Sequence, residues 1–298
     1  MESRKQLRSR MAATLSAQQF TRAMKLMSAS RLRKATDAII RFRPYADRMS
    51  VLMAGLHDLI EEGEFRHYFR ARPPDRIVIV VVTSDRGLCG GFNALVVRTA
   101  IARVQTTFAE QYARGHVILL CVGRKGMQLL RRHGFAGDAR FVDLQRLSSL
   151  SGAFDAGAHL TAQFQAGDVD RIELIYHRFK NVATQVLTHE VMLPIQPAPA
   201  EGPGDDVRYL FEPTEHDVIG ALVARCVEVQ LHRAMLESQA AEMAARMLAM
   251  DKAAENAEEL LRTLKVAFNQ ARQAAITREI AEIMGGTLSG ATSGQRRE

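Results

Sequence analysis

The chain has 298 residues, long enough for two ordinary domains, and its 47% apolar and 24% charged content is typical of globular proteins. Lys and Arg outnumber Asp and Glu by 40 to 33, and the resulting net charge of +7 predicts an anionic partner. Three widely spaced cysteines (Cys89, Cys121 and Cys226) form no CxxC pair. This spacing argues against a disulfide framework or a zinc site and favours a reducing compartment.

The chain also lacks a clear membrane-spanning or secretory pattern. Its longest apolar runs, Ile77–Val82 and Val117–Val122, are far shorter than the roughly 20 residues that span a bilayer. The N-terminus is too charged for a signal peptide. We therefore expect a soluble or peripheral protein.

The first segment, from residue 1 to about Glu62, is predicted to be one long helix. From Leu32 onward its apolar residues recur alternately three and four positions apart, which is the pattern of a coiled-coil seam. Pro44 lies off this seam and should bend the helix rather than end it. The seam positions are Leu32, Ala35, Ile39, Phe42, Ala46, Met49, Met53, Leu56 and Ile60.

The positive charge is concentrated at this end of the chain, where residues 1–34 carry nine basic side chains and one acid, Glu2. Nucleic acid, anionic lipid and an acidic protein surface could each match it. Nucleic acid is disfavoured because no aromatics are interleaved with the bases and no reading module is present. A membrane-surface helix is disfavoured because the heptad seam requires a partner helix.

The central segment alternates strand-like and helical patterns, which predicts an α/β domain of Rossmann-like type with a mainly parallel sheet. Helices are expected at about 92–112, between Gly123 and Gly134, and at about 153–165. The expected strands are 77–83, 116–122, 171–178 and 184–195. Residues 197–206 (PAPAEGPGDD) are predicted to form a loop.

The most conspicuous local motif is Ser84–Asn93, SDRGLCGGFN, between the first strand and the first helix of this domain. Its spacing matches neither G-x-G-x-x-G nor G-x-x-x-x-G-K-[ST]. A structural turn built on Gly87, Gly90 and Gly91 is the favoured interpretation. An anion site at the helix start and a nucleophilic Cys89 stay open as weaker alternatives. Isolated histidines such as His177 and His189 form no catalytic or metal-binding pattern.

The last segment, about 213–285, is predicted to be a second long helix with an even stricter seam. The pattern slips by one residue after Ala275, which predicts that the partner helix ends near that level. Gly285-Gly286 is expected to stop the helix and to leave a polar, flexible tail at 289–298. The seam runs through Met243, Met247, Met250, Ala254, Ala257, Leu261, Leu264, Phe268, Ala271 and Ala275.

Both long helices join the same α/β unit at their inner ends, so they should leave it side by side and antiparallel. The predicted fold class is α/β, with a two-helix coiled coil formed by both termini and a central domain. The expected domains are the N-terminal helix (1–66), the α/β domain (74–207), the C-terminal helix (208–288) and the tail (289–298).

Four segments of the chain together resemble the gamma subunit of F-type ATP synthases. The first, QQFTRAMKLMSASRLRKA at 18–35, resembles that family's N-terminal signature, and Ser84–Asn93 its central signature. Residues 243–257, which begin MAARM, and 271–280, ARQAAITREI, resemble its C-terminal signatures. The resemblance extends in order over about 1–288. It implies a central rotor shaft of a proton-translocating complex, which turns inside a hexamer of alpha and beta subunits and has no active site or cofactor of its own.

The resemblance also implies roles for individual residues. Those expected to contact the alpha and beta subunits are Met24, Lys25, Arg246, Arg272, Gln273, Thr277 and Glu279. Tyr209 and Glu212 are expected to rest on the membrane c-ring, and the α/β domain to carry the epsilon subunit. The resemblance further implies one copy per complex and a peripheral location on the cytoplasmic face of a bacterial plasma membrane.

The chain departs from the family pattern at two points. The polar extension 289–298 stands where the family commonly ends in a short apolar tip, so the chain departs from the family at the expected bearing contact. The redox-regulatory cysteine insertion of chloroplast members is missing, so thiol control is not expected. The alternative function is a nucleotide-binding α/β enzyme with helical dimerisation arms.

Overall fold

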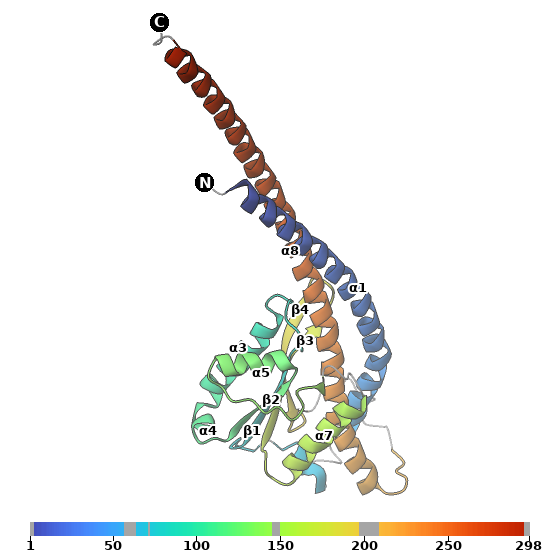
Figure 1. Ribbon diagram of the computed structural model, residues 1–298. Helices are drawn as coiled ribbons and strands as arrows, with labels where there is room; N and C mark the ends of the chain where they lie inside the picture. Colours follow the sequence, from blue (N-terminus) through green and yellow to red (C-terminus); the bar gives the residue numbers. More distant parts are fainter. Residues whose placement is uncertain (1–2, 57–63, 71, 145–149, 197–208, 295–298) are drawn as a thin grey trace. The chain divides into compact units, whose positions relative to one another are not determined.

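The computed structural model describes residues 3–56, 64–70, 72–144, 150–196 and 209–294 (Figure 1). It is a mixed α/β structure with one four-stranded sheet and a long helix at each end of the chain. Its contacts divide it into two compact units, residues 27–249 and residues 1–26 with 250–298. The elements are α1 (Arg4–Gly55), η1 (Glu64–Tyr68), β1 (Ile77–Val82), α3 (Phe92–Thr107), α4 (Ala109–Ala113), β2 (Val117–Val122), α5 (Arg124–Arg132), α7 (Leu150–Gln165), β3 (Arg171–Phe179), β4 (Gln185–Leu193) and α8 (Glu215–Gly294).

The sheet of the 27–249 unit has the strand order β2-β1-β3-β4. The strands β2, β1 and β3 are parallel, and β4 pairs antiparallel with β3 at the edge. The expectation of a mainly parallel sheet is therefore confirmed. All six residues of β1 are buried, which explains why this strand is an unbroken run of Ile and Val rather than an alternating pattern.

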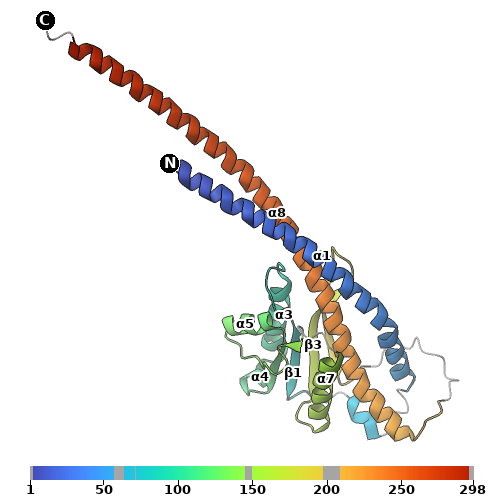
Figure 2. The ribbon, with the colours of Figure 1, turned by 45° about the vertical axis from the view of Figure 1, so that its right-hand side comes forward.

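Helices cover both faces of the sheet, as Figure 2 shows for α3 and α5 on one side and α7 on the other. Ile77, Ile79 and Val81 of β1 pack with α3 and α5. The alternate residues Val78 and Val80 pack with α7, the first part of α8 and the end of α1. The period-2 geometry of a strand thus divides the apolar core into two layers.

Within the same unit, α1 and α8 pack against each other with opposite chain directions. Leu32, Ala35 and Ile39 of α1 cluster with Leu236, Ala240, Met243 and Ala244 of α8. Further along α1, Ala46 and Met49 meet Val229, which lies earlier on α8. The predicted seam positions of α1 from Leu32 to Leu56 are buried, apart from a partly buried Phe42. Ile60 lies outside the described residues.

In the other unit, the first turns of α1 lie beside the second half of α8, as both ribbon views show (Figures 1 and 2). Ion pairs join Arg22 to Glu258 at 3.1 Å and Arg4 to Glu279 at 4.0 Å. Because α1 begins at Arg4, α8 continues beyond it, as the phase slip after Ala275 predicted. Exposure rises there, to 53% at Ile280.

The expected stop at Gly285-Gly286 is wrong, because α8 continues through both glycines to Gly294. Each glycine costs a helix about 1 kcal/mol relative to alanine, which weakens the helix without forbidding it. Residues 289–294 of the expected tail are accordingly helical, and 295–298 lie outside the described residues.

Three further differences concern element boundaries. The helix expected at 92–112 is divided at Phe108, whose φ of −122° is not helical and whose side chain is buried in the core. The helix α1 passes through Pro44 as expected but ends at Gly55. The loop predicted at 197–206 lies outside the described residues. None of the described helices is both long and apolar enough to cross a bilayer.

Candidate interaction sites on the long helices and the glycine turn

Met24 and Lys25 lie on α1 in the unit formed by 1–26 and 250–298. Lys25 Nζ is 2.6 Å from Asp251 Oδ1 on α8, and both side chains are 41% exposed. A half-exposed pair of this kind contributes little to stability, about 0–1 kcal/mol. Lys25 is therefore accessible to an acidic partner at small cost, while Met24 is half-buried beside it.

The residues expected to contact partners further along α8 are exposed. Arg272 and Gln273 project from the helix, and Thr277 Oγ1 donates a hydrogen bond to the Gln273 carbonyl at 3.0 Å. Glu279 is 66% exposed and lies opposite Arg4. Ile276, 46% exposed, adds apolar surface to the same stretch.

Acidic side chains on α8 form ion pairs with some of the basic side chains of α1. The sequence analysis did not predict these pairs. Glu258 binds Arg22 from α1 and also receives a hydrogen bond from Gln18 at 3.4 Å. Asp251 binds Lys25 in the same way. The heptad spacing could have indicated these pairs, because side chains that flank a seam face each other across it.

Arg246 lies in the 27–249 unit and is turned inward, only 7% exposed. Its Nη2 donates to the carbonyl oxygens of Arg86 at 3.1 Å and Gly87 at 3.2 Å. Its Nη1 is 2.7 Å from Glu242 Oε1, one helical turn earlier. Burial raises the pKa of the Glu242 carboxyl, and the Arg246 guanidinium opposes that shift. In this structure Arg246 thus joins α8 to the turn between β1 and α3.

The turn itself is held by its own polar side chains. Asn93 accepts a hydrogen bond from the Ser84 backbone N–H at 2.9 Å and donates one to Ser84 Oγ at 2.8 Å. Leu88 (φ +65°) and Gly90 (φ +60°) both adopt left-handed backbone conformations, which is uncommon for leucine. Of the three glycines expected to build the turn, Gly90 is the one whose φ is positive.

This geometry favours the structural interpretation of the motif. The carbonyls of Arg86 and Gly87 face a buried guanidinium, so that part of the turn binds a cation rather than an anion. Cys89 is 2% exposed, and burial raises the pKa of its thiol. A buried thiol with a raised pKa is a poor nucleophile.

Tyr209 and Glu212 lie on the short segment that precedes α8. Tyr209 is half-buried against the main core and lies over Gly55, where an added Cβ would collide with its hydroxyl. Its ring is 6.4 Å from that of Phe211. The alternate residues point outward: Glu212 is exposed, and Leu210 is 90% exposed.

A buried carboxylate in the middle of the sheet is a further feature that the sequence analysis missed. Glu173 on β3 is fully buried and receives two bonds from Arg103, at 2.8 and 2.9 Å. Arg171 and His189 lie 2.7 and 2.8 Å from its oxygens. Burial alone would raise the pKa of Glu173, but the hydrogen bonds from Arg103, His189 and Arg171 lower it. Glu173 is the one acid in the strand sequence RIELIYHRF, and that isolated charge is the signal that could have revealed the cluster.

No group of three or more His, Cys, Asp or Glu side chains in the described residues is arranged to hold a metal ion. Within each polar cluster described above, the side chains bind one another or the backbone, and several of these contacts join elements that are distant in sequence. Exposed charged side chains occur on the long helices and on the segment before α8, and also on the α/β domain, as at Glu110 and Arg114.

Comparison with known proteins gives matches over nearly the whole chain. The sequence model of the ATP synthase family matches residues 3–289. The ATP synthase gamma chain of Cytophaga hutchinsonii is 39% identical over 289 residues, which cover 96% of this chain and 98% of the relative. The gamma chain of Chlorobaculum tepidum is 38% identical over 286 residues, with coverage of 96% and 98%.

Solved structures of ATP synthases have a similar fold. A chain of the Euglena gracilis mitochondrial ATP synthase (OSCP/F1/c-ring, rotational state 3) superposes with a TM-score of 0.64 at 18% identity, covering 99% of this chain and 96% of that one. A chain of the Tetrahymena thermophila mitochondrial central stalk and c-ring gives 0.57 at 23% identity, covering 78% and 99%.

Proposed function

Since the chain belongs to the ATP synthase gamma-chain family, we propose that it is the central rotor shaft of a proton-translocating F-type ATP synthase. In this role it couples rotation of the membrane ring to sequential conformational changes of the catalytic beta subunits, in ATP synthesis or hydrolysis. It is a non-catalytic subunit with no active site of its own. The observation that carries this function is the near-full-length match to gamma chains, for example at 39% identity to that of Cytophaga hutchinsonii.

The two long helices form the shaft as an antiparallel coiled coil. The buried positions of α1 between Leu32 and Leu56, spaced three and four residues apart, support this proposal. The Rossmann-like classification of the central domain rests on its three parallel strands with helices on both faces. The domain boundaries 1–66, 74–207 and 208–288 belong to the same proposal.

The contacts with the alpha and beta subunits are made by the exposed residues of the shaft. Lys25, whose pair with Asp251 is half-exposed, meets acidic loops of the beta subunits together with Met24. Arg272, Gln273, Thr277 and Glu279 form the upper contact, supported by their exposure on α8. Arg246 belongs to the same proposed contact with the alpha and beta subunits, and its side chain, 7% exposed, also holds the Ser84–Asn93 turn on α8.

The segment before α8 is the foot on the membrane c-ring. Glu212 and Leu210 point outward while Tyr209 anchors the segment to the core, an arrangement suited to a docking surface. The α/β domain carries the epsilon subunit. One copy serves each complex, as a peripheral protein on the cytoplasmic face of a bacterial plasma membrane.

Reconstitution tests this function directly. ATP hydrolysis and the rotation of a bead attached to this chain are measured for alpha and beta subunits assembled with and without it. We expect rotation and full activity to require the chain, and activity independent of it would refute the rotor assignment. Calorimetric titration of the isolated chain with ATP or NAD tests the alternative, a nucleotide-binding enzyme, which requires micromolar binding.

A further inference from the structure

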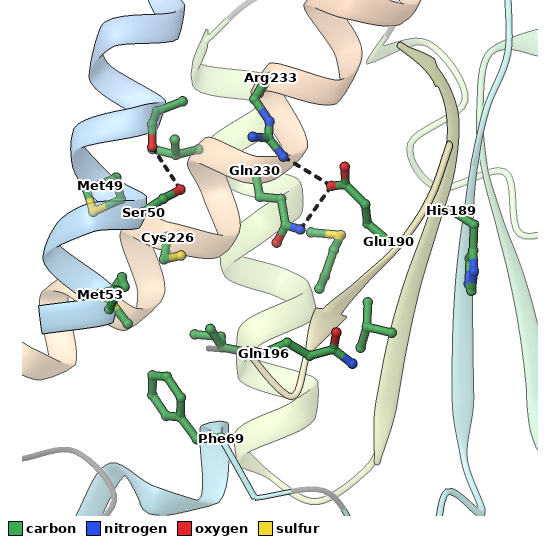
Figure 3. A pocket seen from close by; sticks show the side chains of 16 residues that line it. Met49, Ser50, Met53, Phe69, His189, Glu190, Gln196, Cys226, Gln230 and Arg233 are labelled. Atoms are coloured by element: carbon green, nitrogen blue, oxygen red, sulfur yellow. Dashed lines mark hydrogen bonds and ion pairs between the residues drawn. The ribbon is translucent and has the colours of Figure 1, made fainter. Parts of the chain in front are cut away.

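A cavity of about 680 Å³ lies in the 27–249 unit between α1, β4 and α8 (Figure 3). Its size falls within the range of about 300–1,000 Å³ that small-molecule sites occupy. One part of its wall is polar, with Glu190, Gln230 and Arg233, and another is rich in methionine. None of the proposed partner-binding residues lines it.

The polar part of the wall is organised around Glu190. One carboxylate oxygen accepts a hydrogen bond from the Tyr176 hydroxyl at 2.9 Å. The other accepts bonds from Arg233 Nη2 at 3.1 Å and Gln230 Nε2 at 3.3 Å, drawn as dashed lines in Figure 3. Both oxygens of Glu190 are therefore engaged, and its charge is balanced by Arg233.

Arg233 keeps unused donor capacity at this wall. A guanidinium has five N–H donors, and the described hydrogen bonds of Arg233 engage one nitrogen, Nη2. Its Nε is buried without an acceptor among the described residues. Its side chain is nevertheless 28% exposed, so part of the guanidinium can reach a molecule in the cavity. An oxygen acceptor placed against the exposed part of the guanidinium would pair with an N–H donor that binds no acceptor among the described residues.

The apolar part of the wall can adapt its shape. Met49 and Met53 come from α1, Met192 from β4, and Phe69 closes one end. Methionine is unbranched and polarizable, so it packs against varied apolar shapes. His189 borders the cavity through its strand, but its ring points to the other face of the sheet, where it binds Glu173 (Figure 3).

We propose that this cavity binds a small, neutral, amphipathic molecule, with an acceptor oxygen at Arg233 and an apolar body against Met49, Met53 and Met192. Neutrality follows from the Glu190–Arg233 pair, since a ligand of either charge would meet a like charge within the pair. The bound molecule would contact α1, β4 and α8 together. Binding in this cavity does not depend on the rotor function proposed above.

Photolabelling of the full chain with benzophenone tests the proposal. Benzophenone is neutral, has one carbonyl acceptor and two apolar rings, and reacts on irradiation with nearby C–H bonds. Its excited carbonyl abstracts the hydrogen, the two carbon radicals combine, and the ketone becomes a tertiary alcohol attached to the protein. Mass spectrometry of the digested protein then locates the label.

The exposed fractions of the methionine side chains distinguish binding in the cavity from nonspecific labelling of the surface. Met49, Met53 and Met192 are at most 6% exposed, whereas Met27 is 55% exposed. Binding in the cavity predicts saturable labelling of the three buried methionines, about tenfold above that of Met27. Labelling that follows exposure, with Met27 modified most, would overturn the proposal.

The role of Arg233 is tested by substitution and by competition. Arg233→Lys should reduce labelling about tenfold, because the ammonium lacks the planar set of five N–H donors that lets a guanidinium bind Glu190 and the ligand together. Arg225→Lys, on the same helix and paired with Glu228 away from the cavity, should leave labelling unchanged. Unreduced labelling of Arg233→Lys would refute recognition by the guanidinium.

A competition measurement with the unaltered chain keeps the test valid if the Arg233→Lys variant does not fold. Benzanilide, which has a carbonyl acceptor, should suppress labelling at a concentration about tenfold lower than diphenylmethane, which has none. Equal competition by the two compounds would show that no acceptor is recognised.

Discussion

Replacing Arg246 with alanine should destabilise the 27–249 unit strongly. The change leaves Glu242, which is 6% exposed, as an unpaired buried carboxylate, and it leaves two turn carbonyls without their donor. Breaking a buried ion pair by removing one partner costs about 3–5 kcal/mol, and we expect a loss of unfolding free energy in that range. Arg246→Lys keeps a positive charge near Glu242 but loses the planar guanidinium that reaches both carbonyls. It should lower the free energy of unfolding by about 1–2 kcal/mol.

The measurement is urea denaturation of the full chain, followed by circular dichroism. Arg272→Ala, on the exposed surface of the same helix, is the control and should change stability by no more than about 0.5 kcal/mol. Replacing Arg246 and Glu242 together with leucine should recover most of the loss, because neither charge is then left buried alone. A loss below about 1 kcal/mol for Arg246→Ala, or a double variant as unstable as the single one, would refute the assigned contacts.

Further predictions concern coupling, pH and backbone conformation. In the reconstituted complex, Arg272→Ala should weaken coupling of proton transport to ATP hydrolysis more than Cys89→Ser, and equal effects would argue against the proposed upper contact. The lowered pKa of Glu173 gives stability at pH values above its ordinary 4.5 that is lost as the pH falls below it. Glu173→Gln should therefore cost about 2–4 kcal/mol at neutral pH and flatten the acid side of the stability profile measured by denaturation. Gly90→Ala should lower the unfolding free energy by about 1 kcal/mol because φ is +60°. Gly87→Ala, whose added Cβ would make an ordinary contact with Lys125 Cε at 3.8 Å, should change it by no more than about 0.5 kcal/mol in the same assay.

The regular elements could be predicted from the sequence because their signals are local. The run Ile77–Val82 is apolar throughout, which identified a strand buried on both faces. The heptads of α1 predicted its buried positions, and the phase slip after Ala275 predicted that α8 continues past its partner. Boundaries were less predictable, since the break at Phe108 follows from packing of its ring into the core.

The roles of individual side chains depended on contacts distant in sequence. Arg246 meets the carbonyls of Arg86 and Gly87, about 160 positions earlier, and no local pattern in α8 signals that contact. The resemblance to gamma chains implies a partner contact for this residue, which stays a prediction, and it gave no sign of the contact with the turn. Similarly, Glu173 acquires hydrogen-bond partners from α3 and β4, which only the folded sheet brings together.

The contact between Arg246 and the turn also restricts how α8 can move against the sheet. Apolar packing along a helix is non-directional, so by itself it resists sliding and spinning only weakly. Hydrogen bonds to fixed carbonyls are directional, and a slip of one residue would rotate the guanidinium by about 100° and shift it by about 1.5 Å. The bonds of the Arg246 guanidinium therefore fix the rotation of α8 about its own axis within the 27–249 unit, because the helix cannot rotate there without breaking them. Torque applied to that unit must then turn its own part of α8, up to Ala249, with it.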